Sequence, residues 1–195
     1  MSDVELPDSK ELLEFKEKRF TKRIALVMAL YAVMLAITSL GGNNAAKEMM
    51  LAQQQASNEW AFYQAKASRE HQYRVQHMLV KALLLERGNT MNAAAKAMYE
   101  ELARTSSEEE QRFAGEKKGI EAKAKALERS RDINMSRDPL FDFAEVLLQI
   151  AIVLGSISIL ANSIPVFGIS LGAAGLGTLL MIDGFLLLVR VPFLS

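Results

Sequence analysis

The sequence predicts an all-α membrane protein in which three transmembrane helices carry a long antiparallel helical hairpin, coiled-coil-like, as an arm between the first and the second. Two observations predict this fold class: apolar runs long enough to span a bilayer, and one long charged stretch behind the first of them. The apolar runs are Ile24–Leu40, Phe143–Ile164 and Val166–Val189, and the charged stretch is Asn43–Arg137. A soluble globule mixes its apolar and charged residues more evenly. Both ends of the charged stretch must therefore meet the same face of the membrane.

The composition excludes several classes of function. Lys and Arg together number 23, as do Asp and Glu, and the two signs are interleaved, which argues against a nucleic-acid-binding stripe. The absence of cysteine excludes disulfides, thiolate metal sites and thiol catalysis. Neither His71 nor His77 has a second ligand at metal spacing, and His71 is expected to be packed and hydrogen-bonded. We expect no enzymatic activity, no cofactor and no metal, with membrane lipid as a partner.

Residues 1–23 are predicted to form an N-terminal interfacial segment, in which apolar residues stand among basic ones. Asp8 and Glu11 have the spacing of a capping box. Residues 24–42 follow as the first transmembrane helix. A cleaved signal peptide is the competing interpretation, but the apolar run is longer than a usual signal core and Gly41–Asn44 makes a poor cleavage site. We expect an uncleaved anchor.

Residues 43–138 are predicted to form the hairpin arm, because apolar residues recur there every three or four residues. The first stripe is Met49, Ala52, Ala56, Trp60, Tyr63, Ala67, His71, Val75, Met78, Ala82 and Leu85. The second stripe is Ala95, Met98, Leu102, Phe113, Ile120, Ala124 and Leu127. A gap in the second stripe, with the capping-box pattern of Ser107 and Glu110, predicts a kink or a helix restart.

A turn near residues 88–89 is predicted to join the two arm helices. Gly88 suits the left-handed position that often follows a helix, and Asn89 or Thr90 could cap the second helix.

Folding the charged stretch about that turn aligns the two stripes. Trp60 is then expected near Ile120, and Phe113 near Tyr63 and Ala67. Aromatic side chains of one helix would fill the seam against smaller residues of the other.

Residues 139–195 are predicted to form a transmembrane helical hairpin. Its helices are expected at about 143–164 and 166–189. Asp138 and Pro139 have the pattern of a helix start, and residues 162–165 leave room only for a tight turn.

Two kinds of residue in the spans could carry function. Gly168 and Gly172 form a small-residue pair at the four-residue spacing that indicates close helix packing in membranes. Asp183 lies inside the third span, where a carboxylate is costly and marks an ion or proton site, or a polar contact in an oligomer. The alternative is structural: Arg190 on the same helix face and Glu145 at the same membrane level would join Asp183 in an anchoring charge cluster.

The basic residues give conflicting indications of the side on which the arm lies. Six Lys and Arg residues precede the first span and only Lys47 follows it closely, which favours a periplasmic arm on a multi-pass protein of the cell inner membrane. Five more approach the second span from the arm: Lys123, Lys125, Arg129, Arg131 and Arg137. We favour the periplasmic side because the first span usually dominates orientation, and the opposite side stays open.

Four stretches together resemble a bacterial family described as domain of unknown function 4337. They are Phe20–Arg23, Leu40–Ala45 with Lys47–Glu48, Trp60–Lys66 and Leu147–Leu154. The resemblance implies a membrane-anchored helical protein with one span before the arm and two after it, and it brings no activity, cofactor or site residue. It draws attention to the tryptophan-centred stretch as an interaction site. The candidate residues are Trp60, Phe62, Tyr63, Gln64 and Lys66, with Phe113 on the facing helix.

The missing chemistry, the paired stripes and the small-residue faces predict a non-enzymatic, membrane-anchored scaffold. It would self-associate through its arm and its transmembrane faces into a homo-oligomer. Two alternatives stay open: a pore or transporter subunit that uses Asp183, and an accessory subunit whose arm docks on a larger membrane complex.

Overall fold

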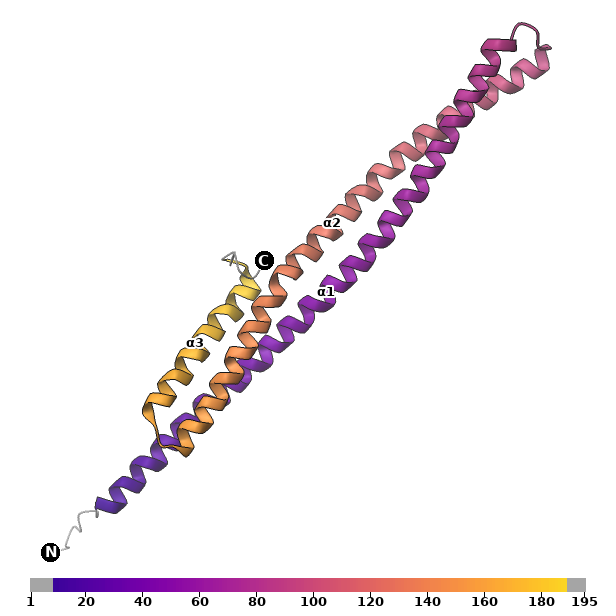
Figure 1. Ribbon diagram of the computed structural model, residues 1–195. Coiled ribbons are helices and arrows are strands. Elements are labelled where there is room, and N and C mark those ends of the chain that lie inside the picture. The colour runs from indigo at the N-terminus through magenta and orange to yellow at the C-terminus, as the bar shows by residue number, and fades with distance from the viewer. Residues whose placement is uncertain (1–8, 189–195) are drawn as a thin grey trace, which may run out of the picture. The chain divides into compact units, whose positions relative to one another are not determined.

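In the computed structural model, the described residues 9–188 form three α-helices and no strand (Figure 1). They are α1, Ser9–Arg87, α2, Ala93–Leu160, and α3, Ile164–Leu186. Side chains are described from residue 18 onward, so the capping box expected at Asp8 and Glu11 lies outside them. All three helices are long and apolar enough to cross a membrane, which supports the predicted class of all-α membrane protein.

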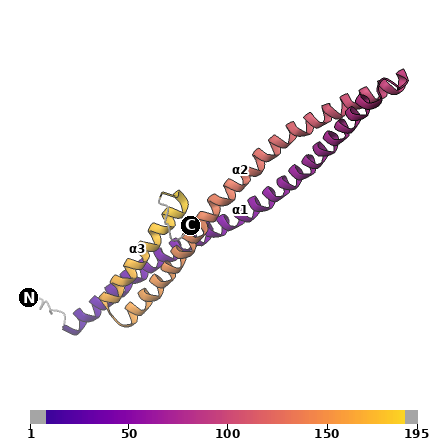
Figure 2. The ribbon, with the colours of Figure 1, turned by 45° about the horizontal axis from the view of Figure 1, so that its top comes forward.

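The helices divide into two units. The membrane unit comprises Met1–Glu48 and Ile133–Ser195, and the arm unit comprises Met49–Asp132. α1 and α2 contribute to both units. In the membrane unit, α3 lies beside segments of α1 and α2 (Figures 1 and 2).

α1 and α2 pass through boundaries at which the sequence suggests a helix end. α1 continues through residues 41–44 without a break. α2 continues through Ser107, so the expected helix restart there is wrong. The gap in the apolar stripe is occupied by Ser106, a small residue that is almost fully buried. A buried small residue keeps two helices close without interrupting either of them.

The expected helix start at Asp138 and Pro139 is also wrong, because Pro139 lies inside α2. A proline inside a helix removes one internal hydrogen bond and strains the preceding turn. The next two residues, Leu140 and Phe141, are both buried. Their packing offsets the lost bond, so the helix continues.

The core of the membrane unit joins all three helices. Tyr31 of α1, Leu148 and Ala151 of α2, and Ala174 of α3 form one buried cluster. Between membrane helices the hydrophobic effect adds little, so association relies on close packing and on hydrogen bonds that cross the interface. One such bond runs from the Ser170 hydroxyl to the Ala151 carbonyl, at 2.7 Å.

Glycines allow the closest approaches in this unit. A Cβ on Gly41 would lie 2.7 Å from the Phe141 ring, and one on Gly177 would lie 3.1 Å from the Ala144 carbonyl oxygen. Phe141 also meets Phe185 edge to face, with ring centroids 4.9 Å apart. Larger residues at these two glycines would push the helices apart.

In the arm unit, α1 and α2 run in opposite directions along a shared seam. Hydrogen bonds join the His77 ring to the Ala103 carbonyl and the Arg74 guanidinium to Glu110. Moving back along α1 from His77 to Arg74 therefore means moving forward along α2, which is the antiparallel arrangement. The α1 side chains of this inner seam are buried or half-buried and recur at intervals of three and four residues. They include Ala52, Ala56, Tyr63, Glu70, Tyr73, His77, Val80 and Leu84.

The second half of the predicted stripe on α1 is wrong by one residue. Met78 and Leu85 are exposed, and the seam positions are His77 and Leu84. The prediction used an average spacing of 3.6 residues, whereas the seam repeats every 3.5, and the two drift apart by about 20° per heptad. Over nearly five heptads from Ala52 the drift adds up to about 100°, which is the rotation around the helix axis from one residue to the next.

The start of α2 also differs from the prediction. Asn92 caps the helix, because its side-chain oxygen accepts a hydrogen bond of 2.7 Å from the Ala95 N–H. The predicted caps, Asn89 and Thr90, lie within the turn. Between α2 and α3 only residues 161–163 intervene, which agrees with the predicted tight turn.

Gly88 is not in the left-handed conformation that the sequence suggested. It is needed for space instead, because a Cβ there would lie 2.4 Å from the Leu84 carbonyl oxygen. The amide of Gly88 donates to that same oxygen at 2.9 Å and closes the last turn of α1.

We expect Gly88→Ala to destabilise the protein by about 1–3 kcal/mol, because the new Cβ meets backbone that can only move by opening this turn. Thermal unfolding of the full-length protein in detergent, followed by circular dichroism, measures the change. Gly119→Ala is the control: nothing lies within 4 Å of a Cβ at this helical position, so it should stabilise by about 0.5–1 kcal/mol. Equal melting of Gly88→Ala and the parent would contradict this account of the turn.

Candidate functional site

The tryptophan-centred stretch lies on α1 in the arm unit and divides between two faces. Trp60, Tyr63 and Lys66 are half-buried, whereas Phe62 and Gln64 are exposed, Phe62 by 62%. Of the five predicted contact residues, three are therefore engaged within the chain and two remain at the surface.

Trp60 reaches across the seam with the polar end of its ring. Its indole Nε1 donates a hydrogen bond of 2.9 Å to the Glu128 carboxylate, and its ring meets Tyr63 edge to face with centroids 5.4 Å apart. Glu128 lies two turns beyond the expected neighbour, Ile120. A half-buried indole N–H needs an acceptor, which an isoleucine cannot supply.

Phe113 of α2 is the most enclosed aromatic side chain of the arm, with 2% exposure. It stacks on Tyr73, ten residues beyond the predicted Tyr63, with centroids 5.7 Å apart and an interplanar angle of 15°. The Lys66 ammonium lies 5.0 Å from the ring centroid and the Arg112 guanidinium 4.8 Å. Cations over an aromatic face are attracted by its quadrupole, so these two side chains shield the ring from water.

Beside this aromatic layer lies a buried carboxylate, Glu70, which is only 7% exposed. Its two oxygens lie 2.5 Å from the Lys117 ammonium and 2.7 Å from the Arg74 guanidinium, and Arg74 reaches on to Glu110 at 2.7 Å. The hydrogen bond from Lys117 is the main reason that the pKa of Glu70 is lowered, and Glu70 in turn raises the pKa of Lys117. Removing the cations would leave a buried charge, which is strongly destabilising.

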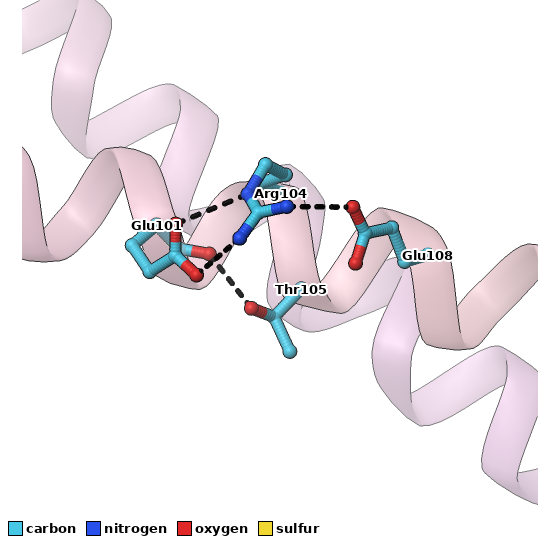
Figure 3. A network of polar contacts seen from close by, with 4 residues as sticks. All are labelled: Glu101, Arg104, Thr105 and Glu108. Carbon is cyan, nitrogen blue, oxygen red and sulfur yellow. Dashed lines mark hydrogen bonds and ion pairs between the residues drawn. The ribbon is translucent and has the colours of Figure 1, made fainter.

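A second polar network lies on the outer surface of α2 and has a different character (Figure 3). Arg104 bridges Glu101 at 2.6 Å and Glu108 at 3.1 Å, and the Thr105 hydroxyl donates to the Glu101 carbonyl. The bond from Arg104 lowers the pKa of Glu101. All four residues are exposed, and exposed ion pairs contribute little to stability. This network is a solvated helix face.

The structure packs His77, and not His71, against the other helix. His71, expected to be packed, is exposed, so that expectation is wrong. His77 is the packed one, with Nδ1 2.8 Å from the Ala103 carbonyl oxygen. The cause is the same one-residue drift of the stripe. Among the residues that the structure describes, no group of three His, Cys, Asp or Glu side chains could hold a metal ion.

Asp183 is buried near the end of α3 in the membrane unit, with 9% exposure. Its backbone carbonyl accepts the Leu187 N–H at 2.6 Å, which closes the helix end. Glu145 on α2 is half-buried and accepts a hydrogen bond of 3.2 Å from the Gln149 amide. Arg190, the expected third member of the charge cluster, lies outside the described residues.

The predicted glycine pair lies on the outside of the membrane unit. Gly168 and Gly172 are exposed, and a Cβ on either of them, or on Gly175, would meet nothing within 4 Å. Close approaches within the unit use other glycines, among them Gly155, where a Cβ would lie 3.0 Å from Met28.

Sequence reasoning missed Glu70, Tyr73 and Lys117, which form the centre of the arm site. When the seam is predicted from apolar residues alone, a charged residue at a seam position is assigned to the solvated face of the helix. Strict three-and-four spacing onward from Ala56 and Tyr63 would have placed Glu70 in the seam.

These contacts hold two helices in register, and they leave two surfaces for other molecules. One is the open glycine face of α3, and the other is the exposed apolar face of α1 in the arm unit. Together they define a helical membrane protein whose arm is held by aromatic and ionic contacts.

The family described as domain of unknown function (DUF4337) matches residues 20–187, so the chain belongs to this family. The match confirms the resemblance seen in the sequence. Comparisons with curated proteins and with solved structures found no match.

The network around Glu70 predicts a pH dependence of stability. Because folding lowers the pKa of Glu70, its charged form stabilises the arm above the ordinary carboxylate range, and this stabilisation is lost as the pH falls through the lowered pKa. Glu70→Gln should lower the melting temperature by roughly 2–8 °C near pH 7, and the difference from the parent should shrink towards about pH 3.

Melting curves across pH, with full-length protein, measure this difference. The control is Glu100→Gln, since Glu100 is exposed and has no ion pair among residues 18–188. It should melt like the parent throughout. A gap between Glu70→Gln and the parent that stays constant with pH would rule out the ionic role.

Proposed function

We propose that this protein is a non-enzymatic, membrane-anchored helical scaffold that self-associates through its arm and through small-residue faces of its transmembrane helices. Its proposed place is the cell inner membrane, with the arm on the periplasmic side. The observation that carries the proposal is the outward glycine face of α3. Gly168, Gly172 and Gly175 recur at four and three residues, and none of them would bring a Cβ within 4 Å of another group.

Small residues at this spacing form a shallow groove along a helix. In a membrane, such a groove lets a second helix approach closely and gain dispersion contacts that lipid tails fill less well. The groove is bordered by exposed, bulky residues, including Ile169, Leu171 and Leu176. Ridges beside a groove match the complementary surface of another copy.

The arm supports the same function outside the spans. We propose that it is a coiled-coil-like helical hairpin, because its buried positions follow three-and-four spacing along α1. A two-helix seam is narrow, and it leaves large apolar residues of α1 exposed, among them Met78 and Leu85. In a charged, solvated segment such residues favour association.

We expect Gly172→Leu to shift the gently extracted protein from an oligomer towards a monomer, because the added side chain fills the groove. Native mass, with identification of all co-purifying chains, measures the shift. Gly115→Leu is the control, since Gly115 is an open glycine of the arm unit and its change leaves the spans untouched.

A monomeric parent protein would refute self-association. A parent that purifies in fixed ratio with a different protein would point to an accessory subunit of a larger membrane complex. A Gly172→Leu protein with the parent's mass would show that the glycine face is not an interface.

A further inference from the structure

In the arm unit, α1 carries a second apolar stripe on the side away from α2. We call it the outer stripe: His71, Val75, Met78, Ala82 and Leu85, all exposed. Three of them are large apolar side chains, and their exposure is 40% for Val75, 62% for Met78 and 88% for Leu85.

The outer stripe has the spacing of a coiled-coil seam. Its residues recur at four, three, four and three, which is the alternation of core positions in a heptad repeat. Each follows a residue of the inner seam by one or two positions, and one residue corresponds to about 100° around a helix. The outer stripe therefore lies nearly opposite the inner seam, and α2 cannot cover it. A shallow groove runs along its edge, with Val75 and Leu79 among the lining residues.

We propose that the outer stripe binds the outer stripe of a second copy of this chain, with the two α1 helices parallel. This inference rests on the proposed self-association and names its contact in the arm. The resulting interface is a two-stranded parallel seam between α1 helices, and each α2 lies on the far side of its own α1.

Charge complementarity supports a second copy in parallel orientation. In a parallel heptad seam, a flanking residue before one core position faces the flanking residue five positions later on the other chain. Before Ala82 stands Lys81, and five residues later stands Glu86. The parallel pair therefore forms two identical ion pairs between Lys81 of one copy and Glu86 of the other.

Both charges are available for this contact. Within the described part of the chain Lys81 has no ion-pair partner, and Glu86 has only its neighbour Arg87, at 3.5 Å with both side chains about two-thirds exposed. An antiparallel pair would instead bring Lys81 against Arg74 or against the second Lys81, which are like charges. Parallel pairing also suits two copies inserted in one bilayer with the same topology, because equivalent residues then meet.

Cysteine cross-linking tests this interface directly, because the chain contains no cysteine. Equivalent core positions of a parallel pair come close enough for a disulfide, with Cα atoms about 6 Å apart. Met78→Cys should therefore form a covalent dimer in isolated membranes under mild oxidation. The matched control is Met98→Cys on α2, where the methionine is 64% exposed against 62% for Met78. We expect at least a tenfold higher yield of dimer from Met78→Cys.

A charge exchange tests the register. Lys81→Glu in the Met78→Cys background should reduce the initial rate of cross-linking by about threefold to tenfold. In this variant the carboxylate introduced at position 81 of each copy faces the Glu86 carboxylate of the other, and the two repel. Adding Glu86→Lys restores opposite charges and should restore the rate. Failure of the double variant to recover would overturn the parallel register.

The outcome for this interface can be separated from that for the scaffold itself. No Met78→Cys dimer while the native mass remains oligomeric would overturn the arm interface and leave the scaffold standing. No dimer together with a monomeric native mass would overturn both. Equal yields from Met78→Cys and Met98→Cys would indicate random collision, and a covalent product with a different protein would exclude the second copy as occupant.

Discussion

The arm rests on a geometric constraint: its buried side chains recur every 3.5 residues along helices that have 3.6 residues per turn. In the coiled-coil-like arm that we propose, two such helices keep a continuous contact by winding slowly around each other. Small residues such as Ala52 and Ala56 and large rings such as Phe113 are all buried in this seam. The contacts across the seam of the arm follow from which residues this spacing turns inward.

One buried position among the described residues of the arm carries a charge, and its ion pairs favour one register. Glu70 is buried, and its two oxygens are occupied by Lys117 across the seam and by Arg74 on the same helix. Sliding one helix by a heptad would separate Glu70 from Lys117 and leave a buried carboxylate with one cation. An alanine-rich seam has little shape to distinguish its registers. The ion pair and the Trp60–Glu128 hydrogen bond supply that distinction.

The sequence is sufficient for the helical class, for three helices long and apolar enough to cross a membrane, and for the tight turn after α2. Long apolar runs and short connections leave few alternatives. The sequence is less informative about where helices end. Pro139 and Ser107 carry local signals for a helix start, but packing of Leu140 and burial of Ser106 override them. Local signals compete with tertiary burial, and burial cannot be read from a short window.

The candidate site shows the same limit in a different form. Trp60 and Lys66 are predicted to belong to one site, but the residues that they meet on α2 depend on the register. Trp60 bonds to Glu128. The Lys66 ammonium lies 2.5 Å from the Glu116 carboxylate. The sequence indicates this register only to within a turn or two. The stripe on α1 could be followed from Ala52, and the error grew with distance until it reached one residue. A small error in the assumed period adds up over five heptads, and the predicted residues then lie on a different face of the helix.

That same difference explains why α1 can serve two contacts at once. Near Ala52 the apolar pattern and the inner seam coincide. Towards Leu85 the two patterns have separated: Val80 and Leu84 lie in the inner seam, and the aliphatic residues Met78 and Leu85 are exposed on the opposite side. In water the hydrophobic effect favours covering that second face, whereas the open glycines of α3 act in lipid, where close packing is the main attraction. The proposed association in the two media thus draws on different forces. The arm contact should weaken with denaturants that act on apolar surface in water, and the glycine contact should respond to the surrounding lipid or detergent.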